Sequence, residues 1–351
     1  MNRSFYLDLA SSGLRMPIGT DLLLHEQSEP DRILRDGQAL GAVVAQAARR
    51  YNSPLAFAHM DLSREKAFLL GLLGIPAEQA AAYHFSGCPG PEVRARLGAS
   101  LEAPLPGDIQ AHVDSIAYVT RQADLLAIGM TIGPFSLMTK LLADPITPIY
   151  LAGSGLSAEE EPEVRTVETL LPLAEQVLHR LVQVQVDAGA RAVFVAEPAA
   201  NIVYVSPKQM EAGSDVFERY VIGPNRRLKM LLEARGVDLV FHCCGEVNDA
   251  ILRAFCGLDP AILSLGSSRR LWEDAAIVPE HIVMFGNLPS KHFYSDTLTR
   301  EEVERQTCEL LTRMRATRHP FILGSECDVL SVPGFERTIR EKVDAFVHCR
   351  C

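Results

Sequence analysis

The sequence lacks the features of a nucleic-acid-binding or membrane-spanning chain. Acidic residues outnumber basic ones by 44 to 34, giving a formal net charge of −10 and a pI near 5.5, which argues against a nucleic-acid partner. No apolar run approaches the roughly 20 residues that a membrane-spanning helix needs. The N-terminal residues also lack the apolar segment of a secretory signal. We therefore expect a cytoplasmic protein that contacts neither nucleic acid nor membrane.

Internal repeats and low-complexity tracts are missing as well, which argues against a repeat protein or a disordered chain. What remains is an ordinary globular composition: 351 residues, of which 48% are hydrophobic and 22% are charged. Such a chain can bury a large core. Its length fits either two average domains or one large α/β barrel.

Eight cysteines in a chain without a secretory signal predict a reducing compartment, with thiols kept for metal binding or packing. Cys349 and Cys351 lie at the C-terminal end, where we expect a frayed tail. A metal ligand or a disulfide in this tail is the alternative.

Eight short apolar runs, each ending in a polar or small residue, recur along the chain. Runs of this length suit parallel strands that are buried on both faces. The eight predicted strands are Met16–Asp21, Leu55–Asp61, Leu125–Thr131, Ala192–Glu197, Leu239–His242, Ala261–Gly266, Ile282–Asn287 and Phe321–Ser325.

Helical segments separate these runs. They are predicted over Asp31–Tyr51, Thr166–Ala188, Arg219–Arg235, Glu246–Phe255 and Thr299–Arg315, and residues 62–123 form a longer helical excursion. Thr299 and Glu302 have the spacing of a capping box. Eight strands alternating with helices predict a single (β/α)8 TIM barrel over residues 1–351. An open doubly wound sheet is the alternative, but the Gly-rich phosphate turn expected after its first strand is missing.

The tripeptide His242-Cys243-Cys244, at the end of a predicted strand, is the most informative motif. Residues two apart on a strand face the same side, so His242 and Cys244 should point together and Cys243 away. Cys327 ends a second apolar run. An imidazole and two thiols at strand ends predict a three-ligand Zn²⁺ site with an open fourth position. The alternative is that these cysteines only fill buried space.

The other strands also end on polar side chains, and active sites of (β/α)8 barrels lie at the C-terminal ends of the strands. Of these residues, Asp61 and Glu197 are the predicted catalytic groups. Glu197 is also the candidate for a fourth zinc ligand, because its strand precedes that of His242. Some of these ends are expected to be turn residues only, since Asp and Asn favour turns. The set comprises Asp21, Asp61, Thr131, Glu197, His242 with Cys244, Asn287 and Cys327.

A wider set of segments carries a family resemblance over nearly the whole chain. The segments are His59–Ser63, Ile132–Leu137, Ala188–Ala190, Ala196–Ala199, Ser206–Gln209, His242–Cys244, Phe285–Leu288 and Gly324–Cys327. They resemble the uroporphyrinogen decarboxylase superfamily and, within it, the corrinoid-dependent methyltransferase branch that includes the methylcobamide:coenzyme M methyltransferases. The segments Gly133–Ser136 and Ser206–Gln209 are shared across the superfamily, so they indicate fold more than activity.

Two features distinguish the branches of this superfamily. The decarboxylases have an Arg-rich N-terminal motif that binds the propionates of the porphyrinogen, whereas the matching region here, residues 13–20, contains only Arg15. The methyltransferase branch has His-x-Cys and a distant Cys, as this chain does at His242, Cys244 and Cys327. The resemblance therefore implies that these three residues bind Zn²⁺. The zinc would activate a thiol such as coenzyme M to accept a methyl group from a methyl-corrinoid. A separate corrinoid protein would deliver the corrinoid, because the chain has no Asp-x-His-x-x-Gly cobalamin-ligand motif.

Three other functions stay open. Tetrahydrofolate would be a different methyl acceptor, with Asp61, Glu197, Asn201 and Asn287 as candidates for proton transfer and for binding the pterin. Decarboxylation of uroporphyrinogen is the second alternative, and a non-catalytic corrinoid-binding or structural zinc protein is the third. The chain departs from the branch pattern at Cys243, and in the acidic residues Glu326 and Asp328 that flank Cys327.

Overall fold

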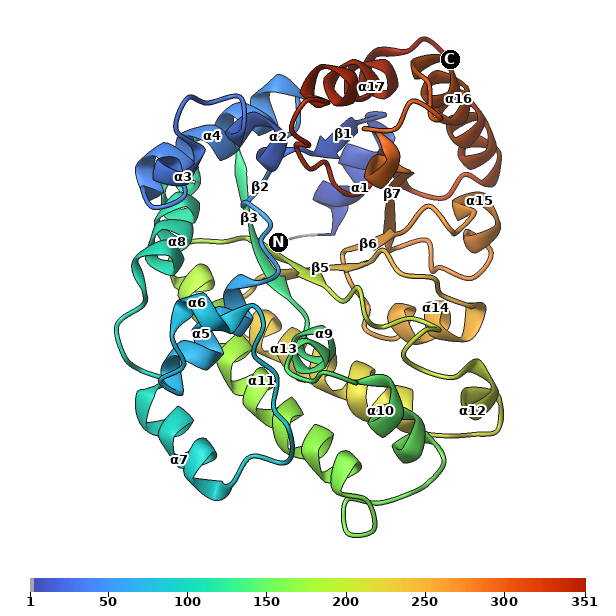
Figure 1. The fold of residues 1–351 in the computed structure, drawn as a ribbon. Helices are drawn as coiled ribbons and strands as arrows, with labels where there is room; N and C mark the ends of the chain where they lie inside the picture. The colour runs from blue at the N-terminus through green and yellow to red at the C-terminus, as the bar shows by residue number, and fades with distance from the viewer. Residues whose placement is uncertain (1–2) are drawn as a thin grey trace.

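A computed structural model describes residues 3–351 of the chain. Its eight strands form one parallel sheet that curls into a barrel, with helices around the outside (Figure 1). The strands are β1 (Arg15–Ile18), β2 (Leu55–Phe57), β3 (Leu126–Ile132), β4 (Ala192–Ala196), β5 (Asp238–Cys243), β6 (Ile262–Leu265), β7 (Val283–Leu288) and β8 (Phe321–Asp328). All eight predicted strands are therefore present.

The strand order is β1-β8-β7-β6-β5-β4-β3-β2, so strands that follow one another in the sequence are neighbours in the sheet, except β1 and β2. β1 and β2 are the two edge strands. A hydrogen bond from Thr20 Oγ1 to the carbonyl oxygen of Phe57, 2.8 Å long, joins the chain after β1 to β2. This nearly closed ring confirms the predicted (β/α)8 barrel, and the open doubly wound sheet is excluded.

The helices mostly follow the predicted pattern, and none within residues 3–351 is long and apolar enough to cross a lipid bilayer. They are α1 (Ser4–Ser11), α2 (Thr20–Leu24), α3 (Pro30–Ile33), α4 (Gly37–Arg50), α5 (Arg64–Leu72), α6 (Ala77–Ala80), α7 (Pro91–Ser100), α8 (Gly107–Thr120), α9 (Pro134–Lys140), α10 (Ile146–Gly153), α11 (Pro162–Asp187), α12 (Pro207–Glu211), the π-helical turn η1 (Glu218–Ile222), α13 (Gly223–Glu233), α14 (Asp249–Cys256), α15 (Leu271–Asp274), the 3₁₀ turn η2 (Ser290–His292), α16 (Arg300–Thr317) and α17 (Glu336–His348). The excursion predicted over residues 62–123 consists of α5 to α8.

Two local predictions need correction. The helix predicted over Asp31–Tyr51 is two helices, because the Asp36 side chain accepts hydrogen bonds from the backbone N–H groups of Gln38 and Ala39 and so caps a new helix, α4. Asp21, predicted to end a strand, lies instead in the short helix α2.

The predicted capping box at the start of α16 is formed only in part. Thr299 Oγ1 accepts from the backbone N–H of Glu302 at 3.2 Å. The Glu302 side chain, however, bonds with Arg305 and Gln306.

The strands separate two apolar layers. Alternate side chains fill the inside of the barrel, where the Phe57 ring lies 5.7 Å from that of Phe194. The other side chains, such as Val193, Val195 and Phe241, pack between the sheet and the helices. This alternation decides which residues at the strand ends face the mouth of the barrel.

The C-terminal tail is fixed to the outer helices and is not frayed as expected. Cys351 forms a disulfide with Cys308 of α16. Arg15 at the start of β1 donates to the carbonyl oxygen of Cys349 at 2.7 Å. The disulfide that the sequence left as an alternative is therefore present in the structure, although the sequence predicted reduced thiols.

Candidate metal centre

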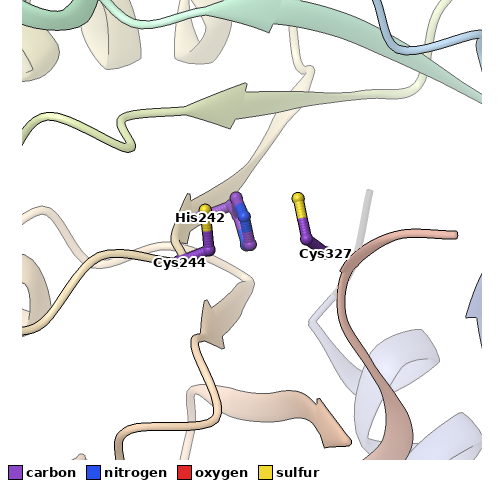
Figure 2. A group of neighbouring side chains, drawn as sticks. All are labelled: His242, Cys244 and Cys327. Atoms are coloured by element: carbon purple, nitrogen blue, oxygen red, sulfur yellow. The ribbon is translucent and has the colours of Figure 1, made fainter. Parts of the chain in front are cut away.

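His242, Cys244 and Cys327 converge at the C-terminal end of the barrel, although Cys327 is 83 residues beyond Cys244 in the sequence. His242 lies in β5, Cys244 directly follows that strand, and Cys327 is the second-last residue of β8. Their possible ligand atoms all lie within 4.8 Å of one another. Figure 2 shows the Cys327 side chain approaching the other two from a separate strand. The barrel thus brings together the three residues that the sequence predicted as metal ligands.

The alternation of β5 explains why Cys244 belongs to this cluster and Cys243 does not. Cys243 packs in the outer apolar layer, fully buried, and its Sγ lies 3.5 Å from the carbonyl oxygen of Ala200. Burial raises the pKa of the Cys243 thiol well above its ordinary value, so this sulfur stays protonated. The prediction that Cys243 points away from His242 and Cys244 is confirmed.

The His242 ring is oriented so that one nitrogen is left for a ligand. His242 is fully buried, and its Nδ1 lies 2.9 Å from Ser264 Oγ on β6. Its Nε2 is buried and has no hydrogen-bond partner in the described chain. A buried polar atom without a partner is costly. A metal ion bound at Nε2 would remove this cost, and the bond at Nδ1 is the kind of contact that orients metal-binding histidines.

The two thiols of the cluster differ in their affinity for a proton. A hydrogen bond with the Cys327 thiol, reinforced by His242 and Lys291, holds the pKa of Cys244 well below its usual range despite burial. The same contact, together with burial, raises the pKa of Cys327. The contact between the two sulfur atoms thus favours ionisation of Cys244 over ionisation of Cys327. A thiolate next to an imidazole nitrogen suits Zn²⁺, which accepts sulfur and nitrogen ligands in a tetrahedral arrangement.

Lys291 and Glu326 complete the polar surroundings of the cluster. Lys291 Nζ, in η2, donates to the carbonyl oxygen of Cys244 at 3.2 Å. Burial lowers the pKa of Lys291, but the negative charges of Cys244 and Glu326 outweigh burial and raise it. The buried Glu326 side chain accepts from the backbone N–H of Ser267 at 2.9 Å. These contacts fix the loops after β6 and β7 beside the ligands.

Asp61, predicted to be catalytic, lies in the loop after β2 and is half-buried. Its Oδ1 accepts from the backbone N–H of Ser63 at 2.9 Å and from the Ser63 hydroxyl at 2.6 Å. Burial tends to raise the pKa of Asp61, but these hydrogen bonds and the charge of Arg64 lower it overall. Asp61 is therefore ionised at neutral pH, and its lowered pKa makes it a weaker base than an ordinary carboxylate. It is not among the residues whose ligand atoms converge with His242.

The carboxylate of Glu197, the other predicted catalytic residue, lies outside the cluster. Its oxygens accept from the backbone N–H groups of Phe135 and Ser136, at 3.1 and 2.8 Å, and from Asn225 Nδ2 at 2.7 Å. A Cβ atom at Gly133 would overlap this carboxylate, so α9 begins directly against it. These contacts support a structural role at the start of α9. They give no support to Glu197 as the fourth zinc ligand.

Asn201 and Asn287, predicted to bind a cofactor, both use their amide groups on the local backbone. Asn201 Nδ2 donates to the carbonyl oxygen of Pro198 at 2.6 Å, and its Oδ1 accepts from the N–H of Val203 at 2.8 Å. Asn287 Nδ2 donates to the carbonyl oxygens of Gly266 and Arg269, at 2.8 and 2.9 Å. Both side chains therefore hold loops at the barrel mouth, and neither amide nitrogen is directed at a ligand.

A second cluster of buried polar residues at the barrel mouth, comprising Asp21, His59 and Asp328, was not predicted as a site from the sequence. Asp21 Oδ1 lies 3.3 Å from His59 Nε2, and Asp21 Oδ2 accepts from the N–H of Ser331 at 2.8 Å. Asp328, directly after Cys327, is buried with both carboxylate oxygens unpartnered in the described chain. Burial and the charge of Asp21 raise the pKa of Asp328 well above its usual range. Two sequence features could have indicated this cluster: the acidic residues that flank Cys327, and the segment that begins at His59.

The comparisons with known proteins agree with this fold. The family model described as uroporphyrinogen decarboxylase (URO-D) matches residues 83–350. A solved structure of a methyltransferase from Methanosarcina mazei superposes with a TM-score of 0.65, covering 99% of this chain and 98% of the other at 14% sequence identity. At this identity the likeness establishes a shared fold. No curated protein sequence matches the chain.

Proposed function

The chain belongs to the uroporphyrinogen decarboxylase family, and from this premise we propose that it is a zinc-dependent methyltransferase. It would transfer a methyl group from a methyl-corrinoid, carried by a partner protein, to a small acceptor, most simply a thiol such as coenzyme M. The structural likeness to a methyltransferase supports the reaction class. The set of candidate zinc ligands, one histidine and two cysteines, supports a thiol as the methyl acceptor.

One observation carries the proposal: an unpartnered, buried imidazole nitrogen converges with two sulfur atoms at the catalytic end of a barrel. A ring nitrogen of His242, Cys244 Sγ and Cys327 Sγ lie within 4.8 Å of one another, and His242 Nε2 has no hydrogen-bond partner in the described chain. Three protein ligands leave one position of a tetrahedral site open, and zinc sites of this type are catalytic. A structural zinc site would instead be closed by a fourth ligand, and the nearest predicted candidate, Glu197, is engaged elsewhere.

A bound zinc ion supplies Lewis acidity that makes a substrate thiol ionise at neutral pH. The side chains around it have separate tasks. Ser264 fixes the orientation of the His242 ring. Asp61, the predicted proton acceptor, is ionised, and its part in proton transfer is what Asp61→Asn tests. In the proposed transfer the thiol sulfur would take the methyl group, and the electron pair of the cobalt–carbon bond would stay on cobalt, so methyl-Co(III) would become Co(I).

The Arg-rich N-terminal motif expected of a porphyrinogen decarboxylase has no counterpart in residues 13–20. A substrate with several carboxylates needs several cations, because an unpaired buried carboxylate is costly. Arg15 is the only arginine of residues 13–20. It lies at the start of β1 and donates to the carbonyl oxygens of Phe346 and Cys349, at the end of the barrel opposite the cluster. Because Arg15 is engaged at that end, it does not bind a substrate carboxylate at the mouth, which favours methyl transfer over decarboxylation of a porphyrinogen.

The proposal is tested by following the cobalt spectrum under anaerobic conditions. The zinc-loaded protein is mixed with methylcobalamin or a methylated corrinoid protein, with and without a panel of thiols. We expect conversion of methyl-Co(III) to Co(I) only when a thiol is present, and no conversion with His242→Ala. A matched control is Cys88→Ser, which removes an exposed cysteine outside the cluster and should leave the rate unchanged.

The alternative functions give different results. Conversion with tetrahydrofolate but with no thiol would make the acceptor wrong and leave the methyltransferase assignment standing. Formation of coproporphyrinogen from uroporphyrinogen at an enzyme-like rate would identify a decarboxylase. If the protein binds zinc but demethylates no corrinoid with either acceptor, the metal is structural and the methyltransferase assignment is wrong.

A further inference from the structure

A second feature of the barrel mouth is a hollow of about 580 Å³, separate from the His-Cys-Cys cluster. It lies among the segments that follow β2, β3 and β4, between α5, α6 and α9. Its volume falls in the range of small-molecule sites. The polar side chains on its wall are Ser63, Lys66, His84, Thr139, Lys140 and Tyr204, and none of the described residues that line it is acidic.

Lys66 is the unusual residue of this hollow. Only 6% of its surface is exposed, and a lysine is rarely buried without a carboxylate partner. Its Nζ has a single hydrogen bond, to the carbonyl oxygen of Ala81 at 3.1 Å. Within residues 3–351, Lys66 has no carboxylate at ion-pair distance. Burial, followed by the charge of Lys140, lowers the pKa of Lys66.

Another buried lysine of the same chain shows what a purely structural lysine looks like. Lys342 in α17 is 3% exposed, and its Nζ donates to the carbonyl oxygens of Phe293 and Ser295, at 2.8 and 2.7 Å. It does not line this hollow. Lys66 has fewer partners and faces an open space. Its remaining N–H groups are therefore available to a ligand.

Lys140 adds a second positive charge to the same wall. Its place in the last turn of α9 is favoured by the helix dipole, so its presence alone requires no ligand. Its charge nevertheless acts on Lys66, and like charges facing one hollow destabilise the empty protein. Asp61 lies two residues before Ser63, and its carboxylate accepts from the Ser63 hydroxyl and is close to the charge of Arg64.

We propose that the hollow bounded by Lys66 and Lys140 is a binding site for the oxyanion group of a small molecule, with a doubly charged, phosphate-type group as the best match. Two ammonium groups provide charge-assisted hydrogen bonds to such an anion. The Ser63 and Tyr204 hydroxyl groups line the same space. A cationic hollow stands out in a chain whose net charge is −10. The site does not depend on zinc or on the proposed methyl transfer.

The test uses inorganic pyrophosphate as the probe and isothermal titration calorimetry at constant ionic strength, with methanesulfonate as a singly charged comparison. We expect saturable binding of one pyrophosphate per chain and weaker binding of methanesulfonate. Lys66→Met and Lys140→Met should each weaken pyrophosphate binding by at least about tenfold, because each removes a charge-assisted contact. The matched control is Lys208→Met, which removes a lysine of α12 outside the hollow and should change the affinity by less than about twofold.

Thermal unfolding provides an independent readout. Pyrophosphate should raise the melting temperature of the wild type but not that of Lys66→Met. If Lys66→Met fails to fold, the Lys140→Met variant still tests the site, because the Lys140 side chain is exposed in the wild type. Absence of saturable binding, or equal weakening by Lys208→Met, would overturn the proposal. Binding should persist in Cys244→Ser, so failure of the zinc chemistry and failure of this site are distinguishable.

Discussion

The hydroxyl of Ser264 offers a sharp test of the metal centre, because it contacts a ligand residue without being a ligand. Ser264 is fully buried, and its Oγ lies 2.9 Å from His242 Nδ1. In Ser264→Ala this contact is lost and the imidazole is free to turn or to change tautomer. His242 Nε2, the atom left for zinc, then spends less time in the position that faces Cys244 and Cys327.

The expected magnitude follows from this contact. Removing a side chain that orients a metal-binding histidine typically lowers metal affinity by about 10–100-fold, which corresponds to about 1.4–2.7 kcal/mol. The cost of leaving a buried polar group without a partner, about 1–3 kcal/mol, falls in the same range. We therefore expect zinc still to bind to Ser264→Ala, but about 10–100-fold more weakly than to the wild type.

Competition against a chromophoric zinc chelator measures this affinity directly. Ser136→Ala is the matched control, since Ser136 is also buried near the barrel mouth and its Oγ accepts from the N–H of Ala199 at 3.0 Å. Both variants should lose some thermal stability, but only Ser264→Ala should lose zinc affinity. If the two variants bind zinc equally well, His242 is not a ligand oriented by Ser264.

Three further results are expected. Cys244→Ser and Cys327→Ser should each reduce zinc from close to one per chain to nearly none by elemental analysis, whereas retention of zinc in both would place the metal elsewhere. Asp61→Asn should slow methyl transfer by roughly 10²–10⁴-fold at unchanged zinc content if Asp61 accepts a proton, and an unchanged rate would remove it from the mechanism. Burial raises the pKa of Asp21, but hydrogen bonds to its carboxylate outweigh burial and lower the pKa below its ordinary value. The folded state thus favours the ionised form of Asp21. The stability that this ionisation contributes is present above the pKa that Asp21 has in the unfolded chain, and it is lost as the pH falls through the lower pKa of the folded state. Asp21→Asn should therefore lower the free energy of unfolding more at neutral pH than in acid in denaturant titrations, and equal losses under both conditions would contradict this linkage.

The barrel was predictable from the sequence because its strands are buried on both faces. Near-continuous apolar runs such as Ala192–Ala196 are typical of buried parallel strands when they alternate with helices. The errors arose where one polar side chain decides the local structure. Asp36 caps α4 and so divides a predicted helix, and the short helix α2 begins immediately after β1 and takes up Asp21. Such effects depend on a few hydrogen bonds that no apolar pattern reveals.

The site was predictable to the extent that strand alternation governs it. Applied to β5, alternation correctly separates Cys243 from His242 and Cys244. Applied to β4 in the same way, it would have grouped Glu197 with Val193 and Val195, which face the helices. The prediction for Glu197 used only its position at a strand end and ignored the side of the sheet. The unpartnered oxygens of Asp328 could not be predicted, because they depend on how neighbouring segments pack.

The contact between Glu197 and His242 shows how a carboxylate outside the cluster still bears on it. The backbone N–H of Glu197 donates to the carbonyl oxygen of His242 at 2.8 Å, while the Glu197 side chain holds the first turn of α9. The end of β4, the start of α9 and the ligand-bearing end of β5 therefore form one hydrogen-bonded unit. The candidate metal ligands lie on the inner side of this unit, and the Glu197 side chain that holds the first turn of α9 lies on the outer side. What marks His242 as a candidate ligand is a buried Nε2 without a hydrogen-bond partner in the described chain, together with the two sulfur atoms beside the ring.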